Sequence, residues 1–133
     1  MDWDRLGRLA TWFTVGLFLG GFAVVAFAQD WVLLDSTDDT TYEARVGSFR
    51  IERTKLNRPV AVLTLRLSRA GSAIFEDNYV SLEDCARGMG RLVTTDMAGR
   101  YRYGNDFVFG GRTIASNIAE TICGLAQPRG QSF

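Results

Sequence analysis

The sequence predicts an α+β protein: an N-terminal transmembrane helix, then an antiparallel β-sheet packed against one C-terminal helix, with a disulfide. Three observations lead to this prediction. An uncharged, mostly apolar run covers residues 9–28, about the length that crosses a bilayer. Apolar and polar residues then alternate with a period of two, as in half-buried strands. Helical spacing of apolar residues is clearest at 113–125.

The length and composition leave room for one compact domain beside the N-terminal segment. The chain has 133 residues, of which 47% are hydrophobic, and 15 basic residues balance 15 acidic ones. We divide it into a cytoplasmic N-terminus (1–8), a transmembrane helix or signal peptide (9–28), an exported α+β domain (29–126) and a tail (127–133). The chain has no histidine, so it lacks the commonest general base and the commonest metal ligand.

The flanks of the apolar run favour a membrane anchor with the N-terminus in the cytoplasm. Arg5 and Arg8 precede the run and the next basic residue is Arg45, so the positive-inside rule places the remainder outside. Trp12 and Trp31 are predicted interface anchors near the two ends. We therefore expect a single-span inner-membrane protein whose C-terminal domain is periplasmic.

Two motifs lie inside the run. Gly16, Gly20 and Gly21 form an extended G-x-x-x-G, which lets a second membrane helix approach closely, although glycine is common in such helices generally. The sequence "AFA" at 26–28 resembles a signal-peptidase site. Cleavage before Gln29 is the alternative to anchoring, and both readings export the domain.

The first predicted strands are "DWVLLDS" (30–36), "TYEARVG" (41–47) and "SFRIERT" (48–54). In the third, alternation predicts that Phe49 and Ile51 face the core. The strongest strand is "RPVAVLTLRLS" (58–68), which is apolar on both faces and is therefore predicted to be central. "IFEDNYVSLEDC" (74–85) is predicted to return beside it.

The next segments are less regular. Ser81 and Asp84 resemble a capping box, but Gly88 and Gly90 disfavour a helix, so for "ARGMGRLVTTDM" (86–97) we favour two strands separated by a glycine bend. "YRYGNDFVF" (101–109) is predicted to form a small hairpin or an ordered loop.

The C-terminal helix has the clearest pattern. Ile114, Ile118, Ile122 and Leu125 form one apolar stripe, and Thr113 is the predicted N-cap. This stripe predicts an amphipathic helix lying on the sheet.

Cys85 and Cys123 are the only cysteines. In an oxidising compartment such a pair is most simply a disulfide, here joining the last helix to the sheet. The alternative is a redox pair, although that function normally uses a C-x-x-C spacing.

Several short motifs resemble the surface-adhesin E-like domains of Gram-negative bacteria. The motifs are "AQDWVLLDSTDDTTY", "YVSLEDC" and "IASNIAETIC", and the similarity covers residues 29–125. The resemblance implies a small exported module with an antiparallel sheet, a C-terminal helix and a disulfide joining them. It also implies that Cys85 ends or follows a strand and that Cys123 lies near the end of the helix. It supplies no catalytic residues.

The sequence offers little catalytic chemistry. Serine and threonine nucleophiles have no histidine partner. The pairs Glu76–Asp77 and Glu83–Asp84 are adjacent, so in a strand their side chains point to opposite faces, and we expect them to be solvated strand edges or turns. We therefore expect no enzymatic activity, catalytic residue, metal or cofactor.

Two groups of residues are candidate partner contacts. One consists of the bases Arg50 and Arg53, with Lys55 and Arg58 nearby, which could meet an acidic protein or anionic lipid headgroups. The other is the aromatic cluster of Tyr101, Tyr103 and Phe107, with Phe109, for any members that are exposed.

These observations favour a non-enzymatic, membrane-tethered protein-interaction domain, an accessory or assembly subunit of an inner-membrane complex. Its expected partners are other membrane protein subunits and the lipid bilayer, with neither nucleic acid nor a small-molecule substrate. The alternative is a cleaved, secreted or surface-displayed adhesin-like binding module.

Overall fold

The computed structural model describes residues 30–127. The chain divides into two units, Met1–Asp30 and Trp31–Phe133. The predicted span 9–28, with Trp12, Gly16, Gly20 and Gly21, lies outside the described residues, as does the tail beyond Gln127. Neither helix within residues 30–127 has the length and apolarity that a membrane crossing requires.

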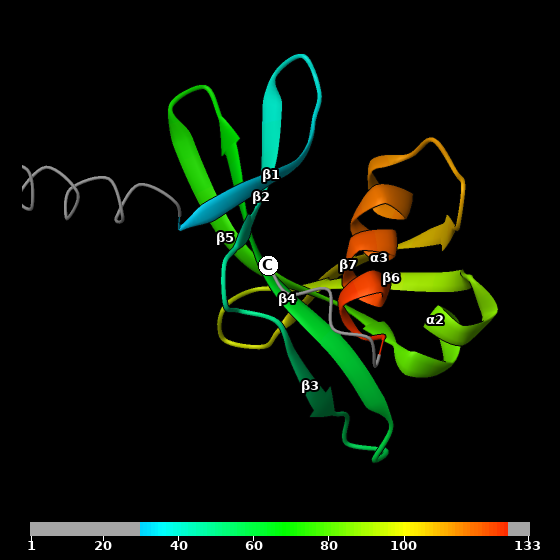
Figure 1. Cartoon of the computed structure of the whole chain (residues 1–133). Coiled ribbons are helices and arrows are strands. Elements are labelled where there is room, and N and C mark those ends of the chain that lie inside the picture. The colour runs from blue at the N-terminus through cyan, green and yellow to red at the C-terminus, as the bar shows by residue number, and fades with distance from the viewer. Residues whose placement is uncertain (1–29, 128–133) are drawn as a thin grey trace, which may run out of the picture. The chain divides into compact units, whose positions relative to one another are not determined.

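Strands and two helices make up the described unit (Figure 1). In chain order they are β1 (Trp31–Ser36), β2 (Thr40–Arg45), β3 (Arg50–Arg53), β4 (Pro59–Arg69), β5 (Ser72–Ser81), α2 (Leu82–Arg87), β6 (Met89–Thr95), β7 (Tyr101–Val108) and α3 (Ile114–Leu125). The predicted antiparallel sheet with a C-terminal helix is therefore confirmed.

The sheet is an antiparallel meander in which each strand pairs with a near neighbour in sequence. The order is β1-β2-β4-β5-β6-β7, and β3 also pairs with β4. Strands β2 and β3 share one side of β4: Ala44 pairs with Leu65 in its second half, and Arg50 pairs with Val62 in its first half. The short β2 and β3 together thus act as one interrupted neighbour of the long central strand.

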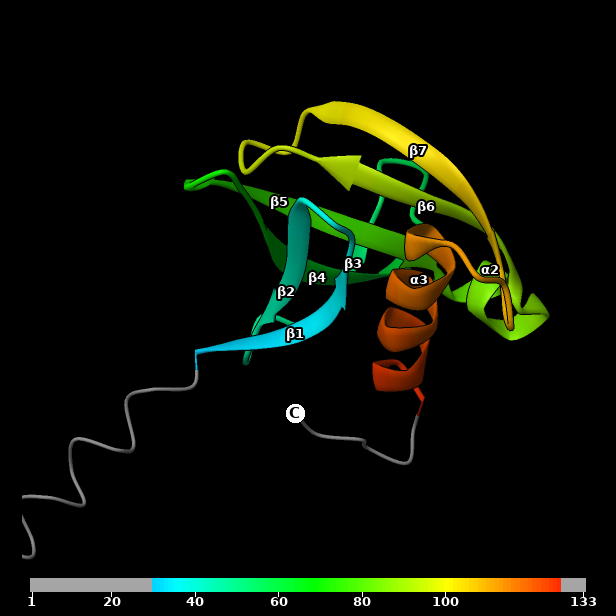
Figure 2. The same ribbon diagram turned by 90° about the horizontal axis from the view of Figure 1, so that it is seen from above.

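Helix α3 lies in the hollow of the curled sheet (Figure 2). It contacts β4 and β5 in the middle of the sheet and also β1 and β7 at the two edges. We call the side that α3 packs against the helix-covered face, and the other side the outer face. On β4, Ala61, Leu63 and Leu65 are buried on the helix-covered face, and Val60 and Val62 are buried on the outer face. The prediction of a central strand with two apolar faces is confirmed.

The helix prediction at 113–125 is also confirmed. Thr113 is the N-cap of α3, and its hydroxyl oxygen accepts a hydrogen bond from the backbone N–H of Ser116 at 3.1 Å. Ile118 and Ile122 are buried, and they join the core cluster with Leu63 and Leu65. Burying this stripe is the main stabilising contribution of the helix, because a helix of this length is marginal on its own.

The structure corrects the prediction for the segment after β5. Residues 82–87 form the short helix α2 and not a strand. Ser81 is the N-cap of this helix, because its hydroxyl oxygen accepts a hydrogen bond from the backbone N–H of Asp84 at 3.1 Å. Gly88 ends the helix with a positive φ of 70°, which suits glycine. The strand predicted after the glycine bend is correct and is β6.

Two further predictions are wrong. Residues 101–108 are a single strand, β7, and not a hairpin of their own: Gly104 pairs with Val93 within a continuous ladder. A Cβ at Gly104 would lie 2.6 Å from Nε of Arg91, so a larger residue there would need this flexible side chain to move aside. Ile51 is 49% exposed rather than buried, since α3 lies over β1, β4, β5 and β7 rather than over β3.

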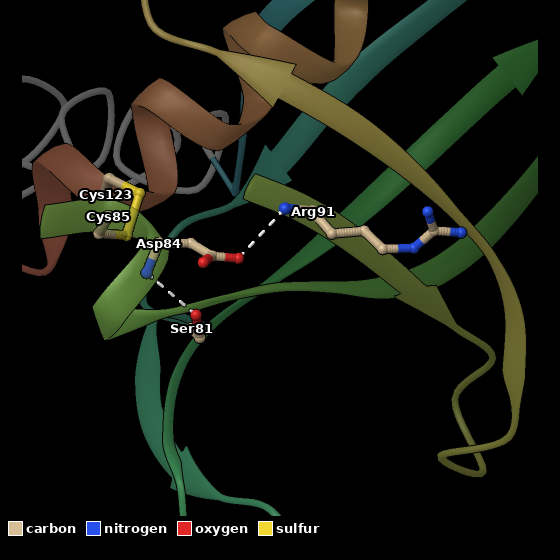
Figure 3. Close-up of a disulfide and its surroundings, with 5 residues drawn as sticks. All are labelled: Ser81, Asp84, Cys85, Arg91 and Cys123. Carbon is tan, nitrogen blue, oxygen red and sulfur yellow. Dashed lines mark hydrogen bonds between the residues drawn. A yellow bond between two sulfur atoms is a disulfide. The ribbon is translucent and has the colours of Figure 1, made fainter. Parts of the chain in front are cut away.

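The disulfide between Cys85 and Cys123 is confirmed and joins α2 to α3, with a Cα–Cα distance of 5.3 Å (Figure 3). Asp84 stabilises the same region, because its carboxylate accepts from the backbone N–H of Arg91 at 3.2 Å. Cys85 thus lies in a helix that follows strand β5, and Cys123 lies in the last turns of α3.

Candidate functional site

A groove of about 830 Å³ opens on the outer face and is a candidate interaction site. We call it the outer groove. Its floor includes Val60, Val62 and Tyr79 from β4 and β5. Its walls are the β3–β4 turn and the β6–β7 turn with the strand ends beside them. They carry the cations Arg53, Lys55 and Arg58 and the apolar side chains of Leu56, Met97 and Tyr101.

Local hydrogen bonds fix the β3–β4 turn. Thr54 accepts twice, through its carbonyl oxygen from the N–H of Asn57 at 2.8 Å and through its hydroxyl oxygen from the N–H of Arg58 at 3.2 Å. Asn57 has a positive φ of 61°, a conformation that asparagine tolerates better than most residues. The turn therefore holds Leu56 outward, and this side chain is 79% exposed.

The β6–β7 turn is fixed in a similar way by one carboxylate. Oδ1 of Asp96 accepts from the backbone N–H groups of Ala98 and Arg100, each at 2.9 Å, and Arg100 also forms an ion pair with it. The hydrogen bond from the Arg100 backbone is the largest of several contacts that lower the pKa of Asp96. This turn presents Met97 and Tyr101, both more than half exposed.

The charges of the outer groove do not balance. Arg50 forms ion pairs with Asp77 at 2.9 Å and with Glu52 at 3.2 Å, so it takes both acidic residues of the groove. Arg53, Lys55 and Arg58 form no ion pair within residues 30–127. The groove is therefore cationic, with apolar side chains beside the unpaired cations.

The structure brings some predicted contact residues together and separates others. Arg50, Arg53 and Tyr101 all line the outer groove, although Tyr101 is far from the arginines in sequence. Tyr103 lies on the other face of the sheet, where it is bonded to Glu76. Phe107 is only 5% exposed and belongs to the core, so it cannot act as a surface contact.

The predicted interface anchor Trp31 begins β1 and packs on the outer face. Its ring centroid lies 5.7 Å from that of Phe75, and the guanidinium carbon of Arg66 lies 4.4 Å above it. In the loop before α3, the backbone N–H of Gly110 donates a hydrogen bond to the carboxylate of Glu120 at 2.9 Å.

A second, smaller cavity of about 310 Å³ lies between the helix-covered face and the first turns of α3. We call it the inner cavity. Its lining includes the polar side chains of Glu76, Asn78, Thr94 and Tyr103 and the apolar ones of Leu92 and Ile118. Glu76 is 3% exposed, so the expectation that Glu76–Asp77 is a solvated pair is wrong for this residue. The two neighbours do point to opposite faces, as predicted.

Hydrogen bonds connect the polar groups of the inner cavity only in part. Tyr103 donates its hydroxyl to the carboxylate of Glu76 at 3.2 Å, and Nη1 of Arg102 lies 3.9 Å from Oε2. Thr94 donates to Oδ1 of Asn78 at 2.8 Å, but Nδ2 of Asn78 has no hydrogen-bond partner. Burial raises the pKa of Glu76, and the hydroxyl of Tyr103 and the positive charge of Arg102 offset this only partly.

Sequence reasoning missed the residues that complete both sites. Leu56 and Met97 lie in turns, where no periodic pattern marks them as part of a surface. Glu76 and Asn78 had a usable signal, since they alternate with the outer-face residues of β5 and share the face of the buried Val80. Among residues 30–127, no group of histidine, cysteine, aspartate and glutamate side chains is arranged to hold a metal ion.

Comparison with known proteins finds no match: no family model, no curated protein and no solved structure matches this chain.

Proposed function

We propose that this chain is a non-enzymatic, membrane-tethered interaction domain of the periplasm, an accessory or assembly subunit of an inner-membrane protein complex. The observation that carries the proposal is the outer groove. It combines unpaired cations, Arg53, Lys55 and Arg58, with exposed apolar side chains on two rigid turns. The anchor expected at 9–28 supports the membrane setting.

The chemistry of the groove indicates what its partner offers. Arg50 already has both local carboxylates, so the other cations are free to attract negative charge from outside. Leu56 and Tyr101 would cover apolar side chains of the partner, and tyrosine is enriched in the parts of interfaces that contribute most energy. The expected occupant is an acidic protein segment that carries apolar side chains.

The test is photo-crosslinking in native membranes, with a photo-reactive amino acid in place of Leu56. We expect a protein adduct that disappears when Lys55→Glu and Arg58→Glu are introduced together. The matched control carries the photo-reactive group at Leu33, which is also exposed but lies outside the groove. An adduct with phospholipid only, or a protein adduct that survives the charge reversal, would contradict the proposal.

The alternative function is that of a cleaved, secreted or surface-displayed binding module of the adhesin kind. The "AFA" motif at 26–28 favours it. N-terminal sequencing of the native protein separates the two functions, because a mature chain that begins at Gln29 has no membrane tether.

A further inference from the structure

The floor of the inner cavity is polar, although the other buried residues on this face of the sheet are apolar. Glu76, Asn78 and Thr94 are each no more than 3% exposed, and they share the helix-covered face with the apolar core. A buried polar group that is left without a partner destabilises the fold, because it has lost its hydrogen bonds to water. Buried polar residues that weaken a small core, gathered in one cavity, are typical of a site kept for binding.

The strand register places these groups side by side. Asn78 of β5 is opposite Thr94 of β6, and Thr94 is opposite Tyr103 of β7, so the three form one row across the sheet. Glu76 is the next residue of β5 on the same face, and Tyr103 reaches it with its hydroxyl. The row therefore comes from the backbone pairing and does not depend on flexible loops.

Two polar side chains in and beside this row, those of Glu76 and Asn78, have unused hydrogen-bonding capacity. Within the described residues, the hydroxyl of Tyr103 is the one group that donates a hydrogen bond to the carboxylate of Glu76. The two carboxylate oxygens can accept several such bonds. Nδ2 of Asn78 is a donor with no acceptor. The cavity thus offers acceptor sites beside an unpaired donor.

These capacities restrict the charge of a ligand. A cation would meet Arg102, which already lies 3.9 Å from the carboxylate, and an ammonium group could not accept from Asn78. An anion would be repelled by Glu76 when that residue is ionised. A hydroxyl group is neutral, and it both donates and accepts.

We propose that the inner cavity binds a small neutral polyol, a saccharide unit, whose hydroxyl groups donate to Glu76 and accept from Asn78. The aliphatic side chains of Leu92 and Ile118, with the aromatic ring of Tyr42, provide apolar wall for the C–H faces of such a ring. The volume of about 310 Å³ lies at the small end of ligand pockets, which suits one sugar ring rather than a long chain. This site is on the opposite face from the outer groove and does not rest on the proposed function.

The experiment is a titration of the ¹⁵N-labelled full chain, in a detergent without a sugar headgroup, with glucose and N-acetylglucosamine. We expect saturable shifts of the side-chain amide resonances of Asn78 and of the backbone amides of Thr94 and Tyr103. The titration extends well beyond the millimolar Kd expected for a ligand of this size, which corresponds to about 4 kcal/mol of binding free energy. No saturable shift with either sugar overturns the proposal.

Two variants make the result specific. Glu76→Gln keeps the shape of the side chain and should weaken sugar binding about tenfold, because hydrogen bonds to an ionised acceptor are stronger. Glu83→Gln is the same chemical change at an exposed residue of α2 and should leave binding unchanged. If Glu76→Gln binds as the unaltered chain does, or if methylammonium or acetate produces the same shifts, the polyol assignment is wrong.

Discussion

The disulfide between Cys85 and Cys123 gives the most quantitative prediction. The perturbation is the double substitution Cys85→Ala and Cys123→Ala, which removes the covalent link between α2 and α3 and leaves no free thiol. The bond joins residues 38 apart in the sequence. In the chain-entropy model, opening a loop of that length destabilises the folded state by about 4 kcal/mol at 25 °C.

The effect should be large relative to the whole stability of such a domain, which is typically about 5–15 kcal/mol. Without the link, α3 is held by its apolar stripe and by a few hydrogen bonds, of which that from Asn117 to Asp35 at 2.6 Å reaches an edge strand. For a domain of this size, 4 kcal/mol lowers the Tm by roughly 15–30 °C.

The assay is urea unfolding of the full chain in mild detergent, followed by circular dichroism. Three samples are compared: the oxidised chain, the oxidised chain after reduction, and the double alanine variant. The two samples without the bond should agree with each other and unfold at much lower urea than the first. A loss below about 1 kcal/mol would refute the reasoning, because the entropy of the open loop would then not control stability.

Two further predictions concern single side chains on strands β5 and β6. Burial raises the pKa of Glu76 in the folded chain, so folding favours the protonated side chain. The stability that results is fully present below the ordinary glutamate pKa of about 4.3. It is lost as the pH rises through the folded-state pKa. Glu76→Gln should therefore gain stability over the unaltered chain as the pH rises, and a stability difference that is constant with pH would contradict this cause. Gly90→Ala should destabilise by about 1–3 kcal/mol, measured by thermal unfolding, because its Cβ would occupy the place of the Asp84 carboxylate that binds the N–H of Arg91. A Gly90→Ala variant that melts with the unaltered chain would show that this carboxylate moves aside at little cost.

The elements that sequence reasoning predicted well are those whose own pattern decides their structure. Strand β4 is apolar on both faces, which is consistent only with a buried central position. Helix α3 has an apolar stripe and a threonine N-cap, so its start and its buried face follow from local chemistry. The two cysteines could form only one intramolecular bond.

The elements that could not be predicted from the sequence depend on contacts between residues that are distant in the chain. Helix α2 has six residues, too few to show a period, and it is stabilised by the Ser81 cap, by Asp84 on Arg91 and by the disulfide. Its residues did carry the capping box, and the two following glycines were given too much weight. A C-cap glycine ends a helix without preventing it.

Both candidate sites also depend on residues that are distant in the chain, so the sequence alone does not predict them. The outer groove needs the β3–β4 turn and the β6–β7 turn to lie on one face, and only the sheet order shows that they do. The inner cavity needs the register that aligns Asn78, Thr94 and Tyr103. The alternating pattern of the sequence places Glu76 and Asn78 on one face of the strand. It does not show that α3 covers that face.

Helix α3 follows every strand of the sheet in the chain, and this order bears on how the domain can form. A ribosome releases the N-terminus first, and a meander pairs each strand with one already made, so the sheet can assemble early. The hollow of that sheet stays open to water, with Leu63 and Leu65 uncovered, until residues 114–125 emerge. We therefore expect a chain that lacks residues 114–125 to expose this apolar surface and to aggregate rather than to form a smaller folded protein.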